Sequence, residues 1–215
     1  MVLTSSGHRW RVRSLVRTSP ATTVYLLAVG GTSTLLSLTN DRFDDRLLLG
    51  LSTNLHQLAR APVRVLVASA FWLGDLSQLW LWAILLVVFL APVERRLGSR
   101  RTVLAFALGH VGATLLVAAG LLVLVRLGEV SPVVEDARDV GASYGVLAVM
   151  ALATYLLPRP FRLPYGALLV GSVALFAARS ETFTDFGHLA SVGIGLGCYP
   201  LARPCASGRR PGRPV

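Results

Sequence analysis

Six apolar runs separated by short charged connections are the feature that most limits what this chain of 215 residues can fold into. A membrane-spanning helix needs ~20 mostly apolar residues. Only 15% of the residues are charged and 53% are apolar, whereas about a quarter of the residues in soluble domains are charged. We therefore predict an all-α membrane protein with six transmembrane helices. The predicted spans are residues 21–39, 76–93, 102–125, 140–157, 163–178 and 186–202.

The charged segments divide the chain into an arm, a membrane domain and a tail. A basic arm at residues 1–20 precedes the membrane domain at 21–202, and a basic tail follows at 203–215. The longest connection, residues 40–75, is predicted to be external. It contains an apolar run at 63–73 that is too short to span, so we expect this run to lie in or dip into the membrane interface.

The arginines predict the orientation of the bundle. The arm, the turn at 94–101, the turn at 158–162 and the tail hold four, four, two and four Arg. All acidic residues outside the spans except Glu94 lie in the other connections. Because basic residues in short loops favour the cytoplasmic side, we predict that both termini are cytoplasmic. The basic residues are all Arg and none is Lys, and Ala, Leu, Val and Gly are frequent. This usage indicates a GC-rich genome, so we predict a bacterial protein in the plasma membrane.

The net charge of +10 does not indicate a nucleic-acid partner, because the basic residues form short clusters between apolar runs rather than one solvated face. No cluster of His, Cys and carboxylate residues has metal-ligand spacing, and no glycine-rich loop follows a strand. We therefore predict no metal and no cofactor. The expected partners are the lipid bilayer and transmembrane proteins, and the oligomeric state stays open.

A serine and a histidine lie near the predicted outer ends of the fourth and sixth spans. Ser143 lies four residues after Asp139, and His188 lies three residues after Asp185. Both spans run from outside to inside, so the rise of a helix places both residues roughly 5 Å below the surface. A histidine inside a span is a functional hypothesis by default. A serine hydroxyl beside an imidazole is the minimal arrangement for nucleophilic catalysis.

Helix packing is the alternative interpretation of the same residues. Gly141 and Gly145 have the Gly-x-x-x-Gly spacing that lets membrane helices approach closely without any chemistry. The sixth span carries a similar set of small residues in Gly187, Ser191 and Gly195. From these residues alone, both interpretations stand, and packing is the more common explanation of such spacing.

Four short motifs occur in a characteristic order. Residues 141–143 are Gly-Ala-Ser, 188–195 are His-Leu-Ala-Ser-Val-Gly-Ile-Gly, 94–98 are Glu-Arg-Arg-Leu-Gly and 63–64 are Val-Arg. Together they resemble the rhomboid family of intramembrane serine proteases. They are similar to its Gly-x-Ser nucleophile motif, its His-x-x-Gly-x-x-x-Gly pattern, its Glu-x-x-x-Gly turn and its Trp-Arg stretch, with Ser191 in place of a Gly and Val63 in place of the Trp.

The resemblance implies a catalytic dyad, with Ser143 as the nucleophile and His188 as the base, and no acid to orient the histidine. It also implies a helical substrate that enters from the bilayer and is cut near the outer surface. Family members commonly bind the oxyanion with a His and an Asn on the second span, where this sequence has Gln78 and Trp82. Tyr144 stands where the family usually has Gly. We expect these three residues to shape the site.

Two functions from different classes follow. The first is an intramembrane serine protease that cleaves membrane-anchored proteins. The alternative is a catalytically inactive rhomboid-like protein that binds the transmembrane helices of client proteins. A small transporter fits less well, because no pair of half-helices is evident and only the sixth span has a candidate charge or histidine near the outer mouth.

Overall fold

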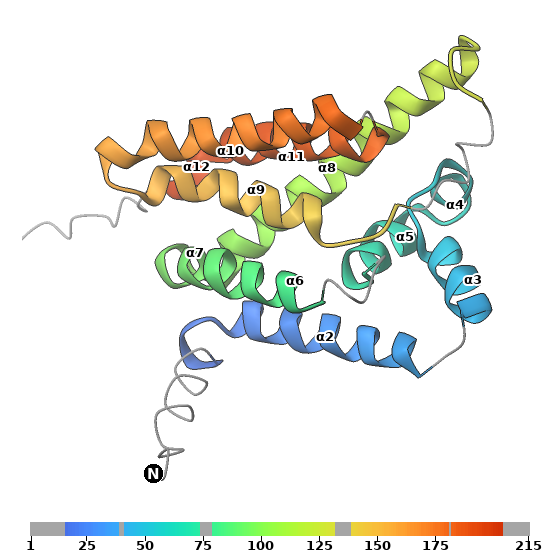
Figure 1. Cartoon of the computed structure of the whole chain (residues 1–215). Coiled ribbons are helices and arrows are strands. Elements are labelled where there is room, and N and C mark those ends of the chain that lie inside the picture. The colour runs from blue at the N-terminus through green and yellow to red at the C-terminus, as the bar shows by residue number, and fades with distance from the viewer. Residues whose placement is uncertain (1–15, 39–40, 74–78, 132–138, 181, 204–215) are drawn as a thin grey trace, which may run out of the picture.

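The structure is a computed structural model, and it describes residues 16–38, 41–73, 79–131, 139–180 and 182–203. The regular elements in these ranges are all helices, as the sequence predicts. The elements, shown in Figure 1, are α2 (Pro20–Ser37), α3 (Asp41–Leu51), α4 (Leu55–Arg60), α5 (Pro62–Ala68), η1 (Ser69–Phe71), α6 (Leu79–Leu85), η3 (Leu86–Leu90), α7 (Ala91–Leu97), α8 (Ser99–Arg126), α9 (Ser143–Ala153), η5 (Thr154–Leu156), α10 (Arg159–Ser180), α11 (Phe183–Gly197) and α12 (Tyr199–Ala202).

Helices occupy each of the six ranges predicted as spans. Within the described ranges, two helices are long and apolar enough to cross a membrane, Ser99–Arg126 and Arg159–Arg179. Other helical stretches are shorter or interrupted. The elements α6, η3 and α7 follow one another without a break, and the π-helical turn η3 comes just before Pro92. Proline has no N–H for the carbonyl four residues earlier, which accounts for the widened turn. The number of spans and the orientation of the termini stay predictions.

The centre of the molecule is a three-helix unit formed by α8, α9 and α11, which make their most extensive contacts with one another. Small residues allow this close approach. A Cβ atom added at Gly109 of α8 would lie 2.1 Å from the Ala148 Cβ on α9. One added at Gly195 of α11 would lie 2.2 Å from the Ala148 carbonyl oxygen. In Figure 1, α9 and α11 run in the same direction, so both helices begin at the same end of the molecule.

The helix α10 lies at the edge of this unit, where it packs on α11. It exposes large apolar side chains, including Leu163, Leu168 and Phe176. In water such a surface would be unusual. In a bilayer, exposed apolar side chains on a helix are expected, because lipid tails are as apolar as leucine.

A buried carboxylate joins α2 to the turn between α7 and α8. Glu94 is 2% exposed. Its Oε1 accepts hydrogen bonds from the Ala21 N–H at 2.8 Å and the Ser99 hydroxyl at 2.6 Å. Its Oε2 accepts from the Thr22 N–H at 2.8 Å and the Thr22 hydroxyl at 2.7 Å. Burial alone would raise the pKa of Glu94, but these hydrogen bonds outweigh it and leave the pKa below its usual value.

The long connection predicted at 40–75 contains the helices α3, α4 and α5, where the sequence predicts only one short interfacial segment. Hydrogen bonds tie the end of this connection, α5 and η1, to α2 and α8. The Thr32 hydroxyl donates to the Phe71 carbonyl oxygen at 2.6 Å. The His110 Nε2 lies 3.1 Å from both the Ser69 hydroxyl and the Leu66 carbonyl oxygen. His110 therefore links α8 to the connection and lies apart from the candidate dyad.

Candidate active site

The segment that leads into α9 is fixed by hydrogen bonds to the long connection at 40–75. The Asp139 N–H donates to the Ser52 hydroxyl at 2.7 Å, and the Thr53 N–H donates to the Asp139 carbonyl oxygen at 3.0 Å. The Gly141 N–H donates to the Ser69 carbonyl oxygen at 2.9 Å. Gly141 has a φ of +141°, a conformation that favours glycine. No atom lies within 4 Å of a Cβ placed on it, so its backbone conformation, and not a close contact, calls for glycine.

Ser143 is the first residue of α9, and its half-buried side chain faces a cavity of about 490 Å³. Residues from α6, η3, α9, α10 and α11 line this cavity, and they include His188, Asp185 and Trp82. The first N–H groups of a helix have no partner inside it. The start of a helix also favours negative charge, and Ser143 stands at this end of α9.

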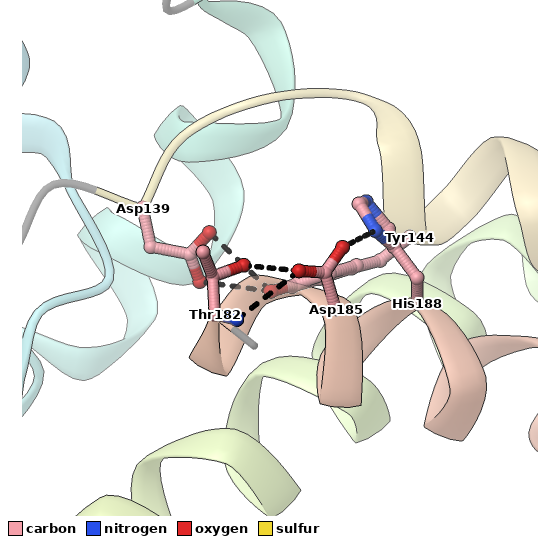
Figure 2. A network of polar contacts seen from close by, with 5 residues as sticks. All are labelled: Asp139, Tyr144, Thr182, Asp185 and His188. Carbon is pink, nitrogen blue, oxygen red and sulfur yellow. Dashed lines mark hydrogen bonds and ion pairs between the residues drawn. The ribbon is translucent and has the colours of Figure 1, made fainter. Parts of the chain in front are cut away.

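His188 lies in the second turn of α11, beside Asp185. Its Nδ1 is 3.7 Å from the Asp185 Oδ1, and the two side chains are 25% and 13% exposed. Figure 2 shows this pair, with one nitrogen of the imidazole ring turned toward the carboxylate. Although Ser143 and His188 line one cavity, no hydrogen bond between these two described residues is formed in the structure.

The Tyr144 side chain fills the space between α9 and α11. It is 2% exposed, and its ring meets the His188 ring edge to face with centroids 5.3 Å apart. The Tyr144 hydroxyl donates toward the Asp139 carboxylate, with distances of 3.4 and 3.5 Å to the two oxygens. A Cβ atom added at Gly187 would lie 2.3 Å from the Tyr144 hydroxyl oxygen. The missing side chain at Gly187 therefore makes room for the tyrosine.

A family model described as rhomboid-like protein matches residues 14–208, which is nearly the whole chain. The chain belongs to the rhomboid-like family. This confirms the resemblance seen in the sequence motifs, and it agrees with the apolar helices of a membrane-embedded protein. The comparisons with curated proteins and with solved structures found no match.

Several residues of this rhomboid-like protein depart from the motifs that the sequence resembles. Trp82 lines the cavity from α6, and Gln78 lies outside the described residues. Ser191, which stands at a glycine position of the motif that the sequence resembles, is fully buried, and its hydroxyl donates to the Tyr144 carbonyl oxygen. Ser191 therefore adds a hydrogen bond between α9 and α11. Gly145 serves packing instead, since it faces the Phe106 ring with 2.4 Å between an added Cβ atom and the nearest ring atom.

Asp185 is the site residue that the sequence interpretation missed. A Thr-x-x-Asp capping box at 182–185 begins α11, and it places the carboxylate one turn before His188. The spacing of three residues between Asp185 and His188 puts both on one helix face. This signal was available in the sequence, but the resemblance implied a histidine without an acid. The described residues hold no group of three or more His, Cys, Asp or Glu that could bind a metal ion.

A second carboxylate, Asp139, lies in the same polar region, as Figure 2 shows. Burial raises the pKa of Asp139, while hydrogen bonds from Thr53 and Tyr144 oppose this rise. Asp139 contacts both Thr53, in the connection at 40–75, and the Tyr144 hydroxyl. A chain of contacts therefore runs from this connection to the ring that packs on His188.

Proposed function

We propose that this rhomboid-like protein is an intramembrane serine protease that cleaves membrane-anchored proteins near the outer surface of a bacterial plasma membrane. The observation that carries the proposal is that Ser143 and His188, from two different helices, line the same cavity. A nucleophile and a base that face one cavity can both reach a substrate bound there. Membership of the rhomboid-like family supports serine proteolysis as the proposed reaction, and the cavity offers a place for the peptide bond.

The chemistry follows from these groups. The Ser143 Oγ attacks the scissile carbonyl carbon while its proton passes to the His188 Nε2. The amides at the start of α9 stabilise the negative charge that develops on the carbonyl oxygen. The proton then passes from Nε2 to the departing amine, and water hydrolyses the acyl-enzyme by the same route. The structure has no hydrogen bond between the described residues Ser143 and His188, so this bond has to form when substrate binds. Such tightening on binding is common, because catalytic contacts are often long in the free enzyme.

The proposed topology has six spans with both termini in the cytoplasm. In this arrangement the beginnings of α9 and α11 face the outer side, so Ser143 and His188 lie close to external water. The cavity lining includes Trp82, Leu168 and Phe176, an apolar surface suited to a transmembrane helix of a substrate. The substrate would enter from the bilayer, and water would reach the serine from outside.

Labelling with a fluorophosphonate probe tests the proposal. Purified protein in detergent is incubated with the probe, and wild type is compared with Ser143→Ala and His188→Ala. We expect labelling of wild type and none of either variant, because the probe needs an activated serine. In parallel, a co-expressed protein with one transmembrane helix should be cleaved only by wild type. Equal labelling of all three proteins, or of none, together with no Ser143-dependent cleavage, would refute the protease function.

The second candidate is a catalytically inactive rhomboid-like protein that binds transmembrane helices. It is favoured by one observation, namely that Ser143 and His188 line one cavity but form no hydrogen bond with each other in the described structure. Cross-linking of a co-expressed client helix distinguishes the two. An inactive binding protein would capture the client equally well as wild type and as Ser143→Ala, and the client would stay intact in both cases.

A further inference from the structure

The two oxygens of the Asp185 carboxylate contact different groups. Its Oδ2 accepts hydrogen bonds from the Thr182 N–H at 3.2 Å and from the Thr182 hydroxyl. Its Oδ1 lies 3.7 Å from the His188 Nδ1. The capping box therefore holds one oxygen and leaves the other beside the imidazole, as Figure 2 shows.

This contact has a consequence for the tautomer of His188. A neutral imidazole carries one proton, and the partner of one ring nitrogen decides which nitrogen keeps it. A carboxylate accepts hydrogen bonds and donates none when it is ionised. Beside Asp185, the proton belongs on Nδ1, and Nε2 is left as the acceptor for the serine proton. That is the tautomer a general base needs.

We propose that Asp185 is a positioning residue for His188, so that the site works as a Ser143–His188–Asp185 triad and not as a dyad. The inference rests on the proposed protease function. When the Ser143 proton moves to Nε2, the ring becomes a cation with its Nδ1–H directed at the carboxylate. Asp185 stays ionised, stabilises that cation and receives no proton.

Packing limits the other orientations of the ring. Tyr144 lies against His188 from α9, and Gly187 leaves no Cβ that would displace the tyrosine. The ionisable groups around His188 come from several elements. They are Asp185 on α11, Tyr144 on α9, Asp139 before α9, which reaches Tyr144, and Tyr165 on α10, which lines the same cavity. Of these four described groups, Asp185 lies within ion-pair distance of the imidazole.

The test compares the pH dependence of fluorophosphonate labelling in wild type, Asp185→Asn and Asp185→Glu. The Asn variant keeps the shape of the side chain but loses its charge, and we expect labelling at least about tenfold slower. Without the carboxylate, the protonated ring is less stable, so the fall of labelling at acidic pH should move to lower pH. The Glu variant keeps the charge and should label faster than the Asn variant.

Thr182→Ala is the matched structural control, because it removes the capping hydroxyl but keeps the carboxylate and the N–H of residue 182 that donates to Oδ2. We expect its melting temperature in detergent to fall. The acidic limb of its pH profile, which is the fall of labelling at acidic pH, should stay at the wild-type pH. If Asp185→Asn labels at the wild-type rate with an unmoved acidic limb, the triad is refuted. The triad is also refuted if labelling of Asp185→Asn and of Thr182→Ala is slowed equally and the acidic limb of each pH profile is unmoved. Asp185 would then act only as a helix cap.

A measurement on wild type alone keeps the inference testable if the Asn variant does not fold. Protein with ¹⁵N-labelled histidine in lipid vesicles gives separate solid-state NMR signals for the two ring nitrogens, and His188→Gln assigns those of His188. At a pH where the ring is neutral, we expect the proton on Nδ1. A proton on Nε2 would overturn the triad. Wild type that is not labelled by the probe at all refutes the protease function instead, so the two failures are distinguishable.

Discussion

The Tyr144 ring and the backbone of Gly187 share one small volume between α9 and α11. The ring contacts His188, so any side chain added at position 187 would displace the group that packs on the proposed base. A protein core tolerates overpacking poorly, because extra methyl groups force side chains out of their preferred rotamers. The volume at position 187 therefore influences both stability and the site.

The substitution Gly187→Ala tests this relationship. We expect it to reduce stability by about 1–3 kcal/mol, seen as a lower melting temperature in detergent. The matched control is Gly193→Ala on the same helix, because no atom lies within 4 Å of a Cβ placed there. Alanine also favours helix over glycine by up to about 1 kcal/mol, so this control should melt no lower than wild type. Equal melting temperatures for the two variants would show that the tyrosine yields at no cost.

Sequence patterns predicted the position of Ser143 and His188 along their helices, but not the contacts between their neighbours. The helical rise from Asp139 and from Asp185 was enough to place both residues near one end of the bundle. The pairing of Tyr144 with Gly187 depends on how α9 and α11 rotate about their own axes, which the apolar pattern does not specify. The orientation of Asp185 toward His188 goes with the capping box at 182–185, a local hydrogen-bonding pattern that the apolar periodicity does not mark.

At the scale of helices, Glu94 holds the start of α2 against the turn between α7 and α8. Replacing Glu94 by Gln keeps one acceptor oxygen but points amide hydrogens at groups that themselves donate. These are either the Ala21 N–H and the Ser99 hydroxyl, which bond to Oε1, or the N–H and hydroxyl of Thr22, which bond to Oε2. An unsatisfied buried donor costs about 1–3 kcal/mol. We expect Glu94→Gln to lower the melting temperature by several degrees without moving the acidic limb of serine labelling.

The same carboxylate predicts a pH dependence of stability. The folded-state pKa of Glu94 lies below its usual value of 4.5. Its contribution is therefore complete above that usual value, and it is lost as the pH falls through the folded-state pKa. Wild type should lose melting temperature on acidification in this range, and Glu94→Gln should lose less. A parallel decline of the two proteins would mean that other carboxylates account for the acid sensitivity.

The apolar runs predicted where the helices lie because backbone pairing in lipid requires helices. They did not predict α3 and α4, because these short helices lie in a mixed stretch without a long apolar run. The hydrogen bonds that tie this stretch to the bundle come from single residues such as Thr32 and His110, which no periodic pattern marks. The interruption of the second predicted span by η3 could have been inferred from Pro92.

For the whole molecule, the proposed orientation can be tested with reporter fusions. Alkaline phosphatase is active only outside the cytoplasm, and a fluorescent protein folds well inside it. We expect phosphatase activity for fusions in the connections at 40–75, 126–139 and 179–185. Fluorescence is expected for fusions in the turns at 94–101 and 158–162 and in the tail. The connection at 40–75 is the sharpest case, since it carries four Arg of its own against the rule that basic loops stay inside.

These fusions also bear on the proposed chemistry, because Ser143 and His188 follow two of the tested connections. If 126–139 and 179–185 report the same outer side, both residues begin their spans at one surface, where water can reach an acyl-enzyme. A fusion in the tail that shows phosphatase activity would require an odd number of spans with a cytoplasmic arm. If the two connections also reported opposite sides, the shared depth of serine and histidine would be lost, and the protease proposal with it.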